Sequence, residues 1–310
     1  MGSLLRPANY TEGPMIRRSF LLILLAAALP ARAQQAPADQ FFDSQGVKIR
    51  YIEAGQGDPV VLIHGFSSSA DTGWRQTGVF DKLARDFRVI ALDCRGHGQS
   101  DKPHDPASYG LAMVEDVARL LDHLRIRRAH IVGYSMGGAI TGTFVVKHPD
   151  RVLTAVLGGS APRMAWTAQN ERDANELAES LEQGNGMRPL VLRLWPADEP
   201  KPSDEALNQR ARASLGRNDA LALAAVQRGG KQQVVTPADV RALPMPMLAV
   251  IGSADPIKAG VDAFSKLKPE LKVVVIDGAS HSGARGAPSR PEFAAAIRDF
   301  LLAHRSAATQ

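Results

Sequence analysis

The sequence predicts an α/β protein with a mostly parallel central sheet that carries helices on both faces. Short continuous apolar runs, which are typical of strands buried on both faces, recur along residues 59–276. Between them lie segments whose apolar residues recur at helical spacing, such as residues 111–124. Repeated strand–helix–strand units of this length form parallel sheets.

The first part of the sheet is predicted from the chain up to residue 162. A turn at Gly46 splits the first stretch into an antiparallel hairpin. The strands predicted here are residues 41–45, 47–55, 59–63, 88–92, 129–134 and 151–159. The helices predicted between them are residues 74–86, 111–124 and 136–149.

The alternation of strands and helices stops at Ser160. Residues 163–240 are polar and helix-forming, are punctuated by Gly and Pro, and contain no convincing strand. Two more strands and a terminal helix are predicted after them, at residues 245–252, 272–278 and 291–304. We therefore predict a sheet core of residues 34–162 and 241–310, with residues 163–240 inserted as a helical cap or lid.

Residues 1–33 are predicted to be a signal peptide. Arg17 and Arg18 precede an apolar run at residues 20–29, and an Ala-x-Ala site ends at Ala33. The run falls short of the ~20 residues that span a bilayer, so we expect no stable membrane anchor after cleavage. The mature protein is expected to be exported, periplasmic or secreted, and the paired arginines make the twin-arginine route an alternative. If Met15 is the true start, residues 1–14 are an over-called leader.

The composition of the mature chain argues against several classes of partner. Removing residues 1–33 takes away four basic residues and one acidic residue, which leaves 33 against 31 and a net charge of +2. This balance gives no basic stripe for nucleic acid. Nucleotide-binding glycine motifs, metal-ligand spacing and paired cysteines are all missing from the sequence, and Cys94 is a single cysteine. We expect no cofactor, no metal and a small-molecule substrate. The sequence does not indicate an oligomeric state.

Chemically active residues follow the predicted strands directly. Because the carboxyl ends of parallel strands meet at one edge of a sheet, ligand sites form there. The residues that follow successive strands are His64-Gly65-Phe66, Asp93, Ser135, Asp255 and His281. The sequence therefore predicts one catalytic site at this edge.

Ser135 is predicted to be a nucleophile on a sharp turn. The segment GYSMGG, residues 133–138, lies between a predicted strand and a predicted helix, which is the setting of a nucleophile elbow. Gly133 and Gly137 leave room for the strained bend at the serine. A plain glycine turn is the alternative for this segment.

A serine nucleophile needs a base and an acid that orients the base, in the chain order Ser, Asp or Glu, His. His281 is assigned as the base because His304 lies in the predicted terminal helix, near the end of the chain. Asp255 is assigned as the acid because it follows a strand, and Asp277 is the fallback.

The developing oxyanion is predicted to be held by the backbone N–H groups of Phe66 and Met136. His64 is expected to brace this loop, next to Gly65, by hydrogen bonding and not to act as a base. Four side chains are candidates for the substrate pocket, although packing of the cap onto the sheet is the alternative for the last three: Tyr134, Met164, Trp166 and Trp195. Since residues 163–240 show few aromatics and no run of Arg, an uncharged acyl substrate is favoured.

With these pieces in place, the sequence resembles the α/β-hydrolase superfamily, in its serine-nucleophile, esterase- and lipase-like branch with a helical cap. The matching pieces run from about residue 40 to 304, in the family's order: residues 64–66, 93–100, 133–138, 252–256 and His281. Two positions depart from the family's pattern, namely Ser280, where glycine is usual before the histidine, and Cys94. The resemblance implies an α/β-hydrolase fold and a triad of Ser135, Asp255 and His281 that works without a cofactor.

The function expected from these residues is hydrolysis of a carboxylic ester or related acyl bond by an exported serine hydrolase, through an acyl-enzyme. Lactonases, carbon–carbon bond hydrolases, perhydrolases and acyltransferases use the same triad and stay open as alternatives. From another class, a non-catalytic ligand-binding protein with this fold also stays open, although such proteins often lose a triad residue.

Overall fold

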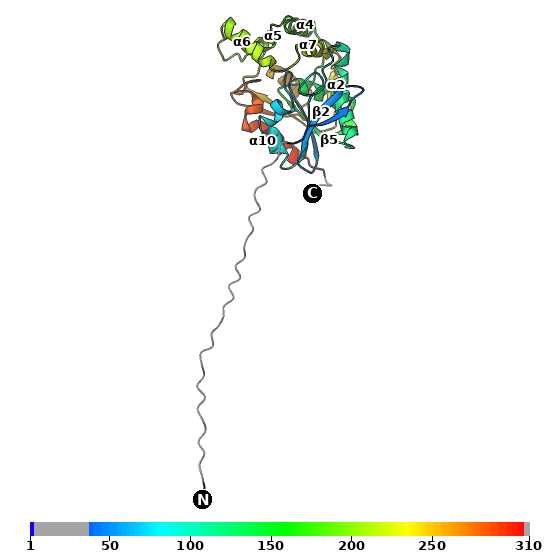
Figure 1. The fold of residues 1–310 in the computed structure, drawn as a ribbon, viewed down its shortest axis with the longest axis vertical. Helices are drawn as coiled ribbons and strands as arrows, with labels where there is room; N and C mark the ends of the chain where they lie inside the picture. Colours follow the sequence, from blue (N-terminus) through cyan, green and yellow to red (C-terminus); the bar gives the residue numbers. More distant parts are fainter. Residues whose placement is uncertain (3–36, 307–310) are drawn as a thin grey trace. The chain divides into compact units, whose positions relative to one another are not determined.

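The computed structural model describes residues 1–2 and 37–306. The predicted signal peptide, residues 1–33, lies outside the described residues apart from its first two. One compact unit covers Pro37–Gln310, and its ribbon is drawn in Figure 1. None of the helices in the described part of the chain is long and apolar enough to cross a membrane.

Eight strands among the described residues form one sheet, in the order β1-β2-β4-β3-β5-β6-β7-β8. β2 pairs antiparallel with β1 and β4, whereas the remaining neighbours pair in parallel. The predicted α/β fold with a mostly parallel sheet is therefore confirmed. The strands are β1 (Gln40–Asp43), β2 (Lys48–Ala54), β3 (Pro59–Ile63), β4 (Arg88–Leu92), β5 (Ala129–Tyr134), β6 (Val152–Gly158), β7 (Met247–Gly252) and β8 (Lys272–Ile276).

Helices cover both faces of the sheet because successive side chains of a strand point to opposite sides. On β3, Val61 and Ile63 enter one apolar cluster, with side chains of α2, α3 and α9. Val60 and Leu62 enter another, with side chains of α1 and α10. These helices are α1 (Val79–Leu83), α2 (Leu111–His123), α3 (Met136–Lys147), α9 (Lys258–Leu267) and α10 (Pro291–Leu302).

Two helical segments differ from the sequence prediction. The helix predicted at residues 74–86 is a π-helical turn, η1 (Ala70–Arg75), followed by the short α1. Gly78 separates them with a φ of 75°, a left-handed conformation that ends helices. α9 was not among the predicted helices, although its buried Val261 and Phe264 recur at helical spacing.

Residues 163–240, all of them described, contain helices and no strand. Figure 1 shows α4 to α7 grouped at one end of the sheet. The segment has its own small apolar cluster, in which Leu177 and Leu181 of α4 contact Leu223 of α7. Its helices are α4 (Ala168–Glu182), α5 (Arg188–Arg193), α6 (Asp204–Leu215), α7 (Ala220–Gly229) and α8 (Pro237–Arg241).

Candidate active site

Ser135 occupies a strained turn between β5 and α3. Its φ is 53° and its ψ is −113°, a conformation that costs a non-glycine residue about 1–3 kcal/mol. The backbone N–H of Ser135 donates to the carbonyl of Gly158 at 2.8 Å, which ties the turn to β6. The two flanking glycines are required by close packing. A Cβ on Gly133 would lie 2.1 Å from the carbonyl oxygen of Gly137, and one on Gly137 would lie 1.9 Å from that of Ile63.

The structure brings Ser135, His281 and Asp255 into one hydrogen-bonded chain. His281 Nε2 lies 2.9 Å from Ser135 Oγ, and His281 Nδ1 lies 2.8 Å from Asp255 Oδ2. Because an ionised carboxylate only accepts hydrogen bonds, Nδ1 carries the proton and Nε2 is left to accept from the serine hydroxyl. Asp255 and His281 are each 3% exposed, so the hydrogen bond between them is shielded from bulk water.

The other candidates for the acid and the base lie elsewhere. Asp255 is held in place by its second oxygen, which accepts from the N–H of Ile257 at 2.9 Å. Asp277 instead accepts from the Ser253 hydroxyl at 3.3 Å, in an exposed turn. The ring of His304, just after α10, donates from Nδ1 to the Phe300 carbonyl near the end of that helix.

Tyr134 has a structural contact that the sequence did not predict. It borders the cavity, as proposed for a pocket residue, but it is 91% buried and its hydroxyl donates to the carbonyl of His281 at 2.5 Å. The two rings lie 5.4 Å apart. Burial raises the pKa of Tyr134 well above its usual value, so the phenol stays a donor at neutral pH. Tyr134 therefore positions the loop that carries His281.

The backbone N–H groups of Phe66 and Met136 are available beside Ser135. Met136 opens α3, where the helix dipole favours negative charge. The loop of Phe66 approaches the turn closely, since a Cβ on Gly65 would lie 3.5 Å from Ser135 Cβ. Within residues 1–2 and 37–306, neither N–H donates a hydrogen bond. Both donors can therefore serve an oxyanion.

His64 braces this loop from beneath. Its Nδ1 donates to the Gly65 carbonyl at 2.7 Å, and its Nε2 accepts from the N–H of Cys94 at 3.0 Å. Burial lowers the pKa of His64, so the ring stays neutral and keeps both bonds. These two bonds join the loop after β3 to the loop after β4. Next to it, burial and the neighbouring His64 lower the pKa of His97 to about 3.

Asp93 fixes two further loops around the site, a role that sequence reasoning missed. Its carboxylate accepts from the N–H of Ala70 at 2.7 Å and from the N–H of Gln99 at 2.8 Å. Arg50 donates to it at 3.1 Å. The sequence signal for Asp93 was its position directly after a strand. That position is equally compatible with a catalytic carboxylate and with one that holds loops in place.

A cavity of about 1190 Å³ lies between the sheet edge and residues 163–240. Ser135 and His281 border it, and so do Met164, Trp166 and Trp195. The indole nitrogen of Trp166 donates to Glu171, which holds the ring in place. Among the described residues, no group of three or more His, Cys, Asp or Glu side chains is arranged to hold a metal ion.

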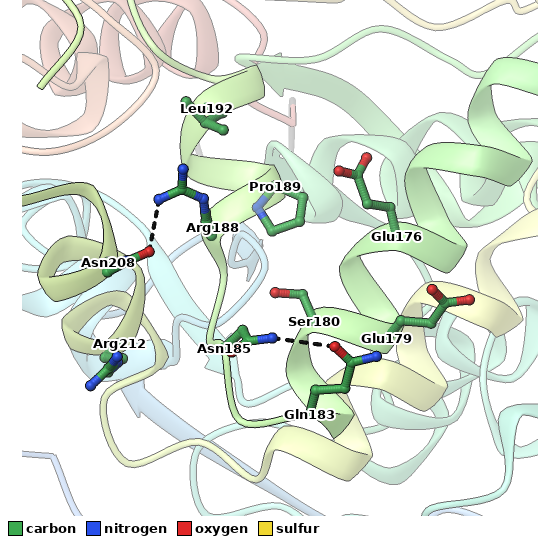
Figure 2. Close-up of a pocket in the computed structure, with 10 residues that line it drawn as sticks. All are labelled: Glu176, Glu179, Ser180, Gln183, Asn185, Arg188, Pro189, Leu192, Asn208 and Arg212. Carbon is green, nitrogen blue, oxygen red and sulfur yellow. Dashed lines mark hydrogen bonds between the residues drawn. The ribbon is translucent and has the colours of Figure 1, made fainter. Parts of the chain in front are cut away.

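Figure 2 shows a different pocket, of about 360 Å³, between α4, α5 and α6. Its lining is mostly polar, and Arg188 donates there to Asn208 at 2.7 Å. Leu192 lies in this pocket and does not line the cavity of Ser135. None of the residues of the Ser135–His281–Asp255 chain lines it.

Comparison with known proteins identifies the family. A family model of the alpha/beta hydrolase fold matches residues 58–186. The chain is 30% identical to 2-hydroxy-6-oxo-6-(2'-aminophenyl)hexa-2,4-dienoic acid hydrolase of Metapseudomonas resinovorans, over 75% of this chain and 80% of the relative. The chain belongs to the α/β-hydrolase family.

Another relative and two solved structures extend this similarity. A putative 2-succinyl-6-hydroxy-2,4-cyclohexadiene-1-carboxylate synthase of Bacillus subtilis is 27% identical, over 76% of this chain and 89% of its own length. A thermophilic esterase from Thermogutta terrifontis matches the fold with a TM-score of 0.71 at 23% identity, over 87% of this chain and 100% of the other. The 2-hydroxy-6-oxo-6-phenylhexa-2,4-dienoate hydrolase from Rhodococcus matches with a TM-score of 0.62 at 26% identity, over 87% and 98%. Membership in this family places the enzyme among the hydrolases.

Proposed function

We propose that this α/β-hydrolase is a serine hydrolase that cleaves a carboxylic ester or a related acyl bond through an acyl-enzyme. The hydrogen-bonded chain Ser135–His281–Asp255 carries the proposal, because its serine borders a large cavity and its acid is buried. A nucleophile, a base and an orienting carboxylate in this order are what acyl transfer requires.

The first half-reaction forms the acyl-enzyme. His281 Nε2 takes the proton of the Ser135 hydroxyl while Oγ attacks the carbonyl carbon of the substrate. The carbonyl oxygen becomes an oxyanion, which accepts from the N–H groups of Phe66 and Met136; each such donor is worth about 3 kcal/mol. The tetrahedral intermediate then collapses, and the leaving alcohol takes its proton from the His281 imidazolium.

The second half-reaction repeats these steps with water. His281 removes a proton from water, whose oxygen attacks the acyl carbon, and Ser135 leaves with the proton returned by His281. Asp255 holds the tautomer with the proton on Nδ1 and stabilises the imidazolium in both halves. Since Asp255 is buried and hydrogen-bonded from Ile257, it needs no reorganisation during the reaction.

Hydrolysis of a carbon–carbon bond is the second candidate function on the same residues. It is favoured by the relative that is named a hydrolase of a 2-hydroxy-6-oxo-hexadienoic acid and is 30% identical over three quarters of this chain. Lactone hydrolysis, perhydrolysis and acyl transfer to another alcohol would also use Ser135. A ligand-binding role without catalysis would leave the intact chain of hydrogen bonds unexplained.

A fluorophosphonate probe tests the nucleophile. Incubation of residues 34–310 with the probe should label Ser135, as located by peptide mass. Labelling should disappear in Ser135→Ala and fall strongly in His281→Ala, while Asp277→Asn, altered at the carboxylate that does not contact His281, should label like the wild type. A folded wild-type protein that takes no label would contradict the proposal.

Substrate panels then separate the two candidate reactions. Nitrophenyl esters of increasing chain length measure ester hydrolysis, and 2-hydroxy-6-oxo-6-phenylhexa-2,4-dienoate measures carbon–carbon cleavage. A kcat/KM for the dienoate that exceeds the best ester by more than tenfold would replace the first candidate with the second.

Export is part of the same proposal. The basic start, apolar run and Ala-x-Ala site at residues 17–33 support removal of a signal peptide and an exported mature enzyme. N-terminal sequencing of exported protein should begin at Gln34. A mature N-terminus that still contains residues 20–29 would contradict this.

A further inference from the structure

The cavity beside Ser135 carries an excess of positive charge. Apart from histidines, its charged wall residues are four arginines and two carboxylates, a net charge of +2. Both carboxylates are already paired. Asp173 lies 3.4 Å from Arg193, and Glu199 lies 2.5 Å from Arg285, which also binds Asp198. The wall arginines without an acidic partner among the described residues are Arg163 and Arg210.

Arg163 is held in place without being neutralised. It follows β6 at the junction with the cap, and its guanidinium stacks 4.9 Å from the ring of Trp166. Nη1 donates to the carbonyl of Gly230 at 3.1 Å, a neutral acceptor. A guanidinium has five N–H donors, so most of them have no partner within the described residues.

Partial burial of Arg163 is not offset by a neighbouring carboxylate of the described chain. The side chain is partly buried, and desolvation lowers its pKa. An anion beside the guanidinium would favour its charged form. Arg210 differs, because it is exposed to solvent and rests 4.8 Å from the ring of Trp195.

We propose that Arg163 binds a carboxylate of the substrate. The substrate class is then an ester, or a related acyl compound, whose end remote from the scissile bond is an anionic carboxylate. The planar fork of the guanidinium suits a carboxylate, and the stacked Trp166 and the Gly230 carbonyl fix its orientation in advance. This inference rests on the proposed function, since it places the anionic group in the cavity that Ser135 borders.

Matched ester pairs test the assignment. Each pair joins a nitrophenyl alkanoate with the mono-nitrophenyl ester of the dicarboxylic acid of the same chain length, from four to six carbons. In the wild type, kcat/KM should favour the acidic member in at least one pair. Arg163→Gln should lower that acidic-to-neutral ratio by about 10- to 100-fold, the range expected for loss of a charge-assisted bond, and Arg163→Lys should restore part of it.

Arg210→Gln is the matched control. It removes a guanidinium from the same cavity wall, but this guanidinium is exposed to solvent. The ratio in this variant should change by less than about threefold, as expected for an exposed charge. Three results would overturn the assignment. The acidic-to-neutral ratio could be unchanged in Arg163→Gln, or it could fall equally in Arg210→Gln. The third is a wild type that prefers the neutral member in every pair.

A binding measurement separates this inference from the proposed function. In the Ser135→Ala background, glutarate binding by calorimetry needs no turnover, and Arg163→Gln should weaken it at least tenfold. If glutarate binds through Arg163 while the wild type cleaves no ester and takes no fluorophosphonate, the proposed function fails and only the carboxylate site at Arg163 stands. If esters are cleaved but the acidic-to-neutral ratio does not change in Arg163→Gln, the proposed function stands and the carboxylate site at Arg163 fails.

Discussion

A hydroxyl group outside the catalytic chain fixes the position of His281. Tyr134 is the last residue of β5, directly before Ser135, and its hydroxyl donates to the backbone carbonyl of His281. One residue therefore links the strand that carries the nucleophile to the loop that carries the base. Because the contact is to a backbone carbonyl, it positions the imidazole and takes no part in proton transfer.

Tyr134→Phe should keep the fold and lose part of the activity. Removal of a single hydrogen bond is worth about 1 kcal/mol, so kcat/KM on a nitrophenyl ester should fall about fivefold. Steady-state kinetics measure this loss, and thermal denaturation shows whether the fold is kept. An activity equal to the wild type would show that the loop is held by its other contacts.

The residues that sequence could and could not assign differ in a physical way. Ser135, Asp255 and His281 each follow a strand in the parallel part of one sheet, and parallel strands bring their carboxyl ends together by construction. The arginines at positions 163, 193, 210 and 285 belong to separate helices and loops, so no run of Arg is visible along the chain. These arginines line one cavity because of the way the cap packs on the sheet. The hydrophobic periodicity of the sequence does not predict that packing.

At the level of elements, the cap helices are tied to the loop of Phe66. Asn218, in the connection between α6 and α7, donates to the carbonyl of Ser67 at 2.8 Å and to that of Leu215 at 2.9 Å. Ser67 has a φ of 57°, an uncommon conformation for serine. The cap therefore helps to hold the residue that follows a proposed oxyanion donor.

Asn218→Ala should reduce turnover more than stability. Without the amide, the Ser67 carbonyl loses a bond of about 1 kcal/mol and the N–H of Phe66 becomes less well placed. We expect kcat to fall three- to tenfold, with a midpoint of thermal unfolding within about 3 °C of the wild type. Asn208→Ala, a cap asparagine in the pocket of Figure 2, serves as the control and should leave kcat within twofold. Equal kinetics for the two variants would contradict a positioning role for Asn218.

The elements themselves were largely predictable, and the exceptions have local causes. The sheet strands are continuous apolar runs, so their predicted bounds lie close to the observed ones. The segment at residues 74–86 breaks because Gly78 adopts a left-handed conformation. Whether a glycine within a helix-like pattern ends the helix depends on the packing around it, here against the core that contains Trp74 and Phe80.

For the whole molecule, buried neutral histidines make stability depend on pH. Burial lowers the pKa of His97 to about 3 and that of His130 to about 4. In the unfolded chain both titrate near 6.5, so between pH 4 and 6.5 the unfolded state binds more protons than the folded one. Their contribution is complete above pH 7 and is lost as the pH falls towards 4.

Urea unfolding should show this loss directly. Below about pH 6, each histidine should lower the free energy of unfolding by about 1.4 kcal/mol per pH unit. His130→Asn, which retains an amide near the Thr154 hydroxyl that His130 contacts at 2.8 Å, should reduce the slope by about 1.4 kcal/mol per pH unit. A slope that is the same in wild type and variant would contradict a neutral, buried His130.

Phe66 joins two parts of the molecule that have different tasks. Its side chain packs against the main apolar cluster and also against the small cluster of the cap, and its backbone N–H is one of the two proposed oxyanion donors. An acyl group that displaces cap side chains packed against Phe66 should therefore also shift its backbone N–H, a proposed oxyanion donor. Substrates of different length should differ in their maximal rate and not in affinity alone, so that selectivity and catalytic power change together as the cap sequence diverges.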